Sequence, residues 1–297
     1  MKAWAPLLLI PLLGAALASG CGGRSEAGSL EALLTRGWQA YSTGDFDYAV
    51  RCFQQVDNAQ TATAEQTYSA LLGLATTYHL ETNPDFPKAR EYYGRLGALD
   101  SDTARMQSAV GLARIDVAAG NAADGRARLT ALIRDSPDSM EADEATIHLA
   151  DAYFAPRTDE SVTGGFRLPT QGSIQRGLET LEGRLASHPH NPLSSSMHMM
   201  LANKYIETKA FDKAVSHLLA ADKEGIAAAR LRSEAIWRVA RIAEEQLKDY
   251  DLAEQYYARY VKEFDRTTLY YRALKSLERV RALKDGRRTS AEETGGA

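Results

Sequence analysis

The chain has 297 residues, of which 44% are hydrophobic and 25% are charged, the composition of an ordinary globular protein. It carries 35 basic and 39 acidic residues, so its net charge is −4. A nucleic-acid-binding protein needs a basic face, and this balance gives no overall support for one. Two cysteines, Cys21 and Cys52, are too few for a disulfide framework.

The first 20 residues show the order of features that secretory signals share. Lys2 supplies a positive start, an uncharged and mostly apolar run covers residues 3–17, and small residues then lead to Cys21. Two prolines and a glycine interrupt the run, which is also shorter than the roughly 20 residues that a membrane-spanning helix needs. Residues 1–20 are therefore expected to be a signal peptide.

The segment Ala18-Ser19-Gly20-Cys21 resembles the lipobox of bacterial lipoproteins, in which the cysteine receives a diacylglycerol and becomes the mature amino terminus. The resemblance implies acyl chains such as palmitate on Cys21 and a flexible tether over residues 21–28. In Gram-negative lipoproteins an aspartate after the cysteine tends to mark inner-membrane retention, and Gly22 stands there instead. The implied location is the outer membrane, facing the periplasm. The alternative is an ordinary secreted protein with an unrelated cysteine.

Small residues recur at a fixed spacing in the body of the chain. Eleven residues separate Gly37 from Ala49, and three more separate Ala49 from Phe53. The same spacing returns in Ala202, Ala214 and Leu218. Two small residues let a pair of helices approach closely, and the bulky residue one turn later fills the gap between them. This pattern resembles the tetratricopeptide repeat, a pair of antiparallel helices that stacks into a superhelix.

The resemblance implies an all-α superhelical solenoid of antiparallel helix pairs over residues 29–284. The expected repeats lie at about 30–63, 64–101, 106–139, 143–191, 195–228 and 232–266. Their small-residue pairs are Gly37 and Ala49, Gly73 and Ala89, Ala113 and Gly125, Ala150 and Gly177, Ala202 and Ala214, and Ala240 and Ala253. An amphipathic helix over about 268–284 is expected to cap the last repeat, and residues 285–297 to form a disordered tail.

The fourth repeat breaks the period with an inserted loop over about residues 155–175. Loops of this length in compact proteins tend to be functional or disordered. Because the insertion contains Phe166 and Leu168, it has apolar side chains that could pack on a neighbour. A tolerated surface insertion and a contact with a partner both remain open.

The sequence contains no motif for a metal, a cofactor or nucleophilic catalysis. It lacks His-Glu-x-x-His, the Gly-x-Ser-x-Gly elbow and the phosphate-binding glycine-rich loop. His188, His190 and His198 could hold zinc only if the fold gathered them, and residues on either side of a proline point apart. Neither a metal nor a cofactor is expected, and the chain is not expected to be an enzyme. Cys52 is expected to be buried and inert.

In the tetratricopeptide family the first helix of each pair lines an inner groove. The resemblance carries this role to Trp38, Tyr41, Leu74, Thr77, Tyr78, Arg114, Asp151, Phe154, Asn203, Ile206, Glu207 and Arg241. A mixture of aromatic rings and scattered charges suits a protein or peptide segment, which the rings anchor and the polar groups align. The alternative for each aromatic, including Trp38 and Tyr41, is a place in the core between repeats.

The leading hypothesis is a membrane-anchored adaptor that binds a protein partner in the cell envelope. In plan the chain is similar to the lipoprotein of the β-barrel assembly machine, and outer-membrane protein, pilus and polymer-export assembly are the candidate settings. One alternative is a periplasmic glycan- or peptidoglycan-binding module that uses Trp38, Tyr41 and Trp237 as stacking platforms. Another is an enzyme with a site near the fourth-repeat loop, involving His148, Asp151 or His188 and His190.

Overall fold

The computed structural model describes residues 29–155, 157–159, 165–167 and 169–295. The expected signal peptide, the lipidation residue Cys21 and the expected tether lie outside the described residues. So do Leu168 and the end of the expected tail at residues 296–297.

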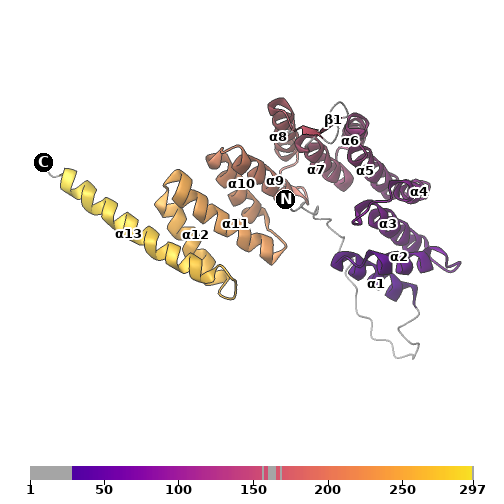
Figure 1. Ribbon diagram of the computed structural model, residues 1–297, viewed down its shortest axis with the longest axis horizontal. Coiled ribbons are helices and arrows are strands. Elements are labelled where there is room, and N and C mark those ends of the chain that lie inside the picture. The colour runs from indigo at the N-terminus through magenta and orange to yellow at the C-terminus, as the bar shows by residue number, and fades with distance from the viewer. Residues whose placement is uncertain (1–28, 156, 160–164, 168, 296–297) are drawn as a thin grey trace.

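Helices dominate the described part of the chain, and they follow one another as pairs (Figure 1). The pairs are α1 (Leu30–Thr43) with α2 (Phe46–Asp57), α3 (Ala64–Leu80) with α4 (Phe86–Gly97), α5 (Asp102–Ala118) with α6 (Ala122–Asp135), α7 (Met140–Phe154) with α8 (Gln171–Ser187), α9 (Ser194–Glu207) with α10 (Phe211–Glu224), and α11 (Ala229–Ile242) with α12 (Tyr250–Glu263). The six pairs begin within a few residues of the expected repeats, so the predicted all-α solenoid is confirmed.

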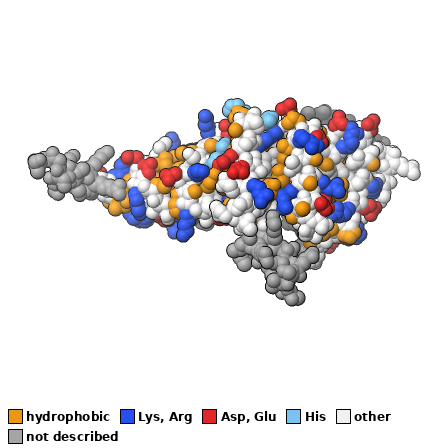
Figure 2. Space-filling model, turned by 90° about the horizontal axis from the view of Figure 1, so that it is seen from above, with side chains coloured by type: hydrophobic (Ala, Val, Ile, Leu, Met, Phe, Trp, Pro, Cys, Tyr) orange, Lys and Arg blue, Asp and Glu red, His pale blue; other side chains and the backbone are white. Residues whose placement is uncertain are grey.

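The pairs stack in chain order into one elongated array, from α1 at one end to the terminal helix α13 (Tyr270–Gly295) at the other (Figure 1). The first helices also touch along the array, since α1 contacts α3, α3 contacts α5, and α5 contacts α7. The surface formed by α1, α3, α5, α7, α9, α11 and α13 is named the first-helix face below. Acidic and basic side chains are interspersed over the side of the array seen in Figure 2.

The same short signal starts the second helix in three of the pairs. Asp45, Asp85 and Asp249 each accept a hydrogen bond from a backbone N–H in the first turn of α2, α4 and α12. An aromatic residue follows each aspartate and opens the helix. A side-chain oxygen at this position satisfies a backbone donor that the helix itself leaves unpaired. The local sequence thereby fixes where the chain turns back on itself.

The predicted small-residue pairs lie where the two helices of each pair meet. Each of the 12 residues named for the six pairs is buried. Phe53, Tyr93, Leu218 and Tyr257, which follow the second small residue by one turn, are at most 1% exposed. Cys52 is also 1% exposed, as expected from its place beside Phe53. Close backbone approach and one bulky side chain per interface therefore build the core.

Phe53 shows how tight this arrangement is. Its ring lies against Gly37 of α1 and Gly73 of α3. A β-carbon added at Gly37 would lie 2.7 Å from Cε1 of the ring, and one added at Gly73 would lie 2.6 Å from Cζ. Only glycine leaves enough room at these two positions, which explains why α1 and α3 each carry glycine where they face Phe53.

The insertion in the fourth pair contains a short hairpin. Strand β1 (Arg157–Asp159) pairs antiparallel with β2 (Gly165–Arg167), with Thr158 opposite Phe166. Helix α8 begins at Gln171, a few residues before the expected end of the loop at 175. The hairpin supplies backbone partners to a segment that lies outside the helix pairs.

The terminal helix α13 covers the last pair, as the solenoid requires. Ala273, Leu277 and Val280 are buried in the same apolar cluster as Tyr256 and Tyr260 of α12. The helical backbone continues to Gly295, well beyond the expected end at Lys284, so the expected tail is helical through most of its length. Within the part of the chain that the structure describes, no helix combines the length and apolarity needed to span a bilayer.

Candidate partner-binding site

The expected groove residues divide into accessible and buried ones. Asp151, Glu207 and Arg241 are exposed, whereas Leu74 and Thr77 are fully buried. The half-buried ones are Trp38, Tyr41, Tyr78, Arg114, Asn203 and Ile206. The predicted array of groove residues is therefore only partly accessible on the first-helix face.

The structure places Leu74, Thr77 and Phe154 in the core and not on the surface where the sequence had predicted them. Leu74 packs in the cluster around Phe53, and the hydroxyl of Thr77 donates a hydrogen bond to the Gly73 carbonyl within its own helix. Phe154 is 8% exposed and lies against Gly177 of α8. These three side chains stabilise the interfaces between helices, so they cannot contact a partner on the surface.

Half-buried polar and aromatic groups connect neighbouring first helices. The Trp38 indole N–H of α1 donates to the Ser69 hydroxyl of α3 over 3.0 Å. The Asn203 side chain of α9 accepts a hydrogen bond from Arg238 of α11. Because these contacts run along the first-helix face, they fix the relative positions of successive pairs. They also engage Trp38 and Asn203, which the sequence had assigned to a partner.

Arg114 of α5 lies in the electrostatic environment of His79, His148 and Glu144. Burial lowers the pKa of His79 to about 3, with a further contribution from the Arg114 charge. Burial raises the pKa of Glu144, but the hydrogen bonds from His148 and Gln107 and the Arg114 charge outweigh it, so the net shift is downward. In the part of the chain that the structure describes, Arg114 has no ion pair. This polar centre accordingly combines an anionic Glu144 with neutral histidines.

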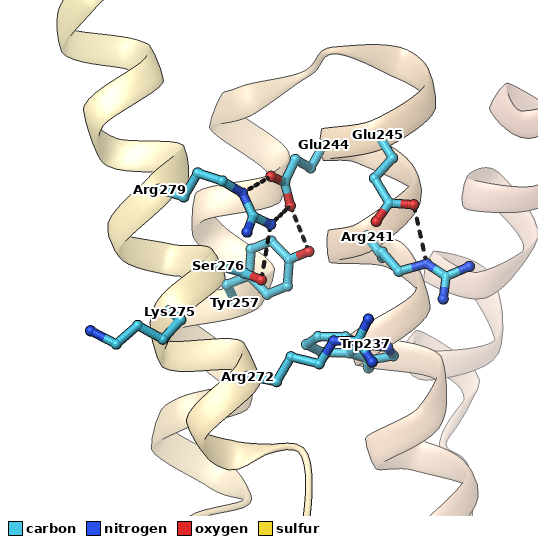
Figure 3. A pocket seen from close by; sticks show the side chains of 9 residues that line it. All are labelled: Trp237, Arg241, Glu244, Glu245, Tyr257, Arg272, Lys275, Ser276 and Arg279. Atoms are coloured by element: carbon cyan, nitrogen blue, oxygen red, sulfur yellow. Dashed lines mark hydrogen bonds and ion pairs between the residues drawn. The ribbon is translucent and has the colours of Figure 1, made fainter.

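A pocket of about 430 Å³ lies at the carboxyl-terminal end of the first-helix face (Figure 3). It opens between α11 and α13, and α12 contributes Tyr257. The lining residues are Trp237, Arg241, Glu244, Glu245, Tyr257, Arg272, Lys275, Ser276 and Arg279. Its size falls in the range of sites for small molecules or single side chains of a partner. The pocket is named the α11–α13 pocket below.

A buried carboxylate holds one wall of the α11–α13 pocket in place. Glu244 accepts hydrogen bonds from Arg279 Nε over 2.6 Å, from Arg279 Nη2 over 2.9 Å, and from the Tyr257 hydroxyl over 2.8 Å. Burial alone raises the pKa of Glu244, but the hydrogen bonds from Arg279 and Tyr257 lower it below its usual value. The two-pronged Arg279 contact ties α13 to the segment that directly follows α11 through a charge-assisted pair.

A π-helical segment brings Glu244 to this position. It is η2 (Ala243–Leu247), which continues α11 and ends at Lys248 in the left-handed conformation, with φ of 56°. A π-helical turn holds more residues than an α-helical turn, so side chains near it leave the α-helical register. Glu244 is buried there while the neighbouring Glu245 is exposed and pairs with Arg241 at 3.4 Å. Such segments are frequent at functional sites.

An aromatic ring and a cation form the other wall. The Trp237 side chain is 7% exposed, and the Arg272 guanidinium lies 5.7 Å from the centre of its ring. Tyr257 and Tyr260 pack against Trp237 in T-shaped arrangements, with centroid distances of 5.5 and 5.8 Å. These contacts hold the indole rigidly and orient Arg272 over it (Figure 3).

The sequence points only in part to this pocket. Arg241 and Trp237 are candidate binding residues from the sequence, whereas α13 is expected only as a cap. The missed signal is the spacing of Arg272, Lys275 and Arg279, which places three cations on one face of α13. Their convergence on η2 depends on the π-helical segment, which the sequence pattern does not reveal.

The histidines considered for an enzymatic or metal-binding site are not gathered at one place, because each contacts a different partner. His148 Nε2 is 3.5 Å from Glu144 Oε1, and His188 Nε2 is 3.2 Å from Asp138 Oδ1. His198 lies instead against His217, with 2.9 Å between their Nδ1 atoms. Over the described ranges, no cluster of three or more His, Cys, Asp or Glu side chains is arranged to hold a metal ion.

Comparison with known proteins finds the repeat directly. The sequence profile of the tetratricopeptide repeat matches residues 234–267, which cover most of α11 and all of η2 and α12. A search of curated protein sequences finds no match.

Solved structures with a similar arrangement include PilF of Pseudomonas aeruginosa, with 16% sequence identity and a TM-score of 0.46. The similarity covers 82% of this chain and 95% of PilF. TTC0263, a thermophilic tetratricopeptide protein of Thermus thermophilus, has 16% identity and a TM-score of 0.43. The similarity covers 84% of this chain and 99% of TTC0263. The helix pairs, their small-residue interfaces and the matched repeat make this chain a tetratricopeptide-type solenoid, a fold that typically serves as a non-catalytic scaffold for protein interactions.

Proposed function

We propose that the chain is a lipid-anchored scaffold of a bacterial cell envelope that binds a protein partner on its first-helix face. The observation that carries the proposal is the array itself. Six stacked pairs and a cap form one array, in which successive first helices contact one another from α1 to α7, and stacked repeats of this kind present extended binding surfaces. Exposed Asp151, Glu207 and Arg241 lie on the first helices α7, α9 and α11 and give this part of the face polar contact points.

The anchoring part of the proposal rests on the sequence. The order of a positive start, an apolar run, small residues and Cys21 supports lipidation at the cysteine. Two or more acyl chains hold a protein firmly at a bilayer, whereas one holds it only marginally. The absence of aspartate at Gly22 supports an outer-membrane location facing the periplasm, where the scaffold would serve an assembly process.

Membrane fractionation of the cell envelope tests the anchor. The wild-type chain is expected in the outer-membrane fraction, with its mass increased by the lipid, and the Cys21→Ser variant is expected to lose both properties. Cys52→Ser is the matched control, since it removes the other thiol, and it should remain in the membrane fraction. An unlipidated wild-type chain, or a Cys21→Ser variant that stays in the outer membrane, would contradict the anchor.

The structure gives less support to a glycan-binding module. Sugar stacking needs an open aromatic face, but Trp237 is 7% exposed and Arg272 lies over its ring. The Trp38 ring is occupied by edge contacts with Phe53 and Tyr41, at centroid distances of 5.0 and 5.8 Å. Both indoles therefore suit packing better than sugar stacking.

A further inference from the structure

We infer that the α11–α13 pocket binds a carboxylate group of an extended partner segment. This inference rests on the proposed function, because it names the chemistry of the partner that the first-helix face receives. The contacts of the pocket, its charge and its asymmetry each support the assignment.

The charge of the pocket is opposite to that of the chain. Four cationic and two anionic side chains line it, which gives 4 − 2 = +2, whereas the whole chain carries −4. A local positive field in a negative protein favours an anionic ligand and disfavours other parts of the same chain.

The cations of the pocket differ in how firmly they are engaged. Arg279 is committed to the buried carboxylate of Glu244. Lys275 pairs with Glu278 at the surface, where the two side chains are 76% and 55% exposed. Exposed pairs of this kind contribute little free energy, so a ligand can replace one at small cost.

Arg272 is the cation best placed to receive a ligand. It is exposed, it lies over Trp237, and across the described residues it has no carboxylate partner. A guanidinium can hold a carboxylate through two parallel hydrogen bonds. The ring beneath Arg272 restricts the side chain before binding, which reduces the entropy lost when the ligand arrives.

The two sides of the pocket set the orientation of the ligand. Arg272, Lys275, Ser276 and Arg279 all come from α13, whereas the acidic groups come from η2 (Figure 3). A ligand carboxylate is therefore drawn toward α13 and repelled by exposed Glu245. A volume of about 430 Å³ accepts one or two residues, not a folded domain.

Fluorescence anisotropy with the full-length chain in detergent tests the inference. The probe is the labelled peptide Gly-Ser-Asp-Phe-Glu-Phe, used with a free and with an amidated carboxyl terminus. The neutral counterpart, amidated Gly-Ser-Asn-Phe-Gln-Phe, should bind at least tenfold more weakly than the better acidic peptide. Loss of affinity on amidation would assign the site to a terminal carboxylate, and equal affinity would assign it to acidic side chains.

Substitutions locate the binding in the pocket. Arg272→Gln should weaken acidic-peptide binding about tenfold or more, because it removes the charge-assisted hydrogen bonds. Lys262→Gln removes a positive charge from an exposed position on α12 that does not line the pocket, so it should change the affinity less than twofold. Thermal unfolding of both variants verifies the fold. Equal affinity of the two variants, or equal affinity for acidic and neutral peptides, would overturn the inference.

Two further outcomes separate this inference from the proposed function. Phosphatidylglycerol vesicles that bind through Arg272 while the acidic peptides do not would overturn it in favour of a lipid headgroup. A protein partner that crosslinks to the first-helix face while Arg272→Gln leaves its affinity unchanged would also overturn it, yet it would leave the proposed scaffold intact. Peptide binding without any protein partner in the envelope would instead contradict the scaffold.

Discussion

The Phe53 ring lies so close to Gly73 that a β-carbon at this glycine would stand 2.6 Å from the ring atom Cζ. The ring is fully buried and also lies against Gly37 of α1, so it cannot move away from Gly73 toward α1. Gly73→Ala should therefore lower the free energy of unfolding by about 1–3 kcal/mol, as overpacked cores do. Urea denaturation followed by circular dichroism measures the change.

Gly94 provides a matched control for this substitution. It also lies in a helix, but a β-carbon added there would meet nothing within 4 Å. Gly94→Ala should raise stability by about 0.5–1 kcal/mol, because alanine loses less backbone entropy in a helix than glycine. Similar destabilisation by both substitutions would show that a cause other than contact with Phe53 sets the result.

A buried ion pair joins the two helices on either side of the insertion. Arg184 Nε of α8 donates to Asp143 Oδ1 of α7 over 2.6 Å, and the two side chains are 6% and 4% exposed. Arg184 Nη1 also donates to the Pro137 carbonyl over 2.6 Å. Asp143→Ala should cost about 3–5 kcal/mol of stability, because it leaves the Arg184 charge buried without its partner.

The double variant Asp143→Leu/Arg184→Met is the control for the buried charge. Replacing both partners with apolar side chains removes the unpaired charge, so most of the loss seen in Asp143→Ala should be recovered. Chemical denaturation of the single and double variants gives the comparison. A single variant within about 1 kcal/mol of the wild type would show that the pair is well hydrated.

Acid should destabilise the fold partly through His79. Burial lowers the pKa of His79 from 6.5 to about 3, with smaller contributions from Arg114, His148 and Arg90. Between these two values the unfolded chain binds one more proton at this residue than the folded chain does. The stabilisation is therefore complete above about pH 6.5 and is lost as the pH falls toward 3, with a slope of up to about 1.4 kcal/mol per pH unit.

Urea midpoints measured between pH 7 and pH 4 test this effect. The His79→Leu variant removes the titrating group and should lose less stability over that range than the wild type. The control is His190→Gln, since the His190 side chain is 85% exposed. A His79→Leu curve parallel to that of the wild type would contradict the assignment of His79 as an acid-sensitive core residue.

The sequence predicts the helix pairs well because their physical requirements are local. Close approach of two helices needs small residues such as Gly37 and Ala49, and an aspartate such as Asp45 starts the second helix through one hydrogen bond. Both signals recur at repeat spacing, so they can be read without any knowledge of distant contacts. The number and order of the pairs follow from them.

The accessible part of the first-helix face is harder to predict. Leu74, Thr77 and Phe154 occupy the expected register positions, but neighbouring helices cover them. The extent of that cover depends on how successive pairs rotate against one another, which residue spacing does not encode. The α11–α13 pocket depends in the same way on η2 and on the approach of α13 to α11.

Site-specific photocrosslinking in the native cell tests the central claim, that a protein partner binds the first-helix face. A photoreactive residue would replace exposed Asp151, Glu207 or Arg241 on that face, or exposed Glu91, Arg134 or Lys262 on the second helices. The account predicts crosslinks to the same envelope protein from the first set and none to it from the second. Crosslinks to that protein only from the second set, or equally from both sets, would contradict the claim.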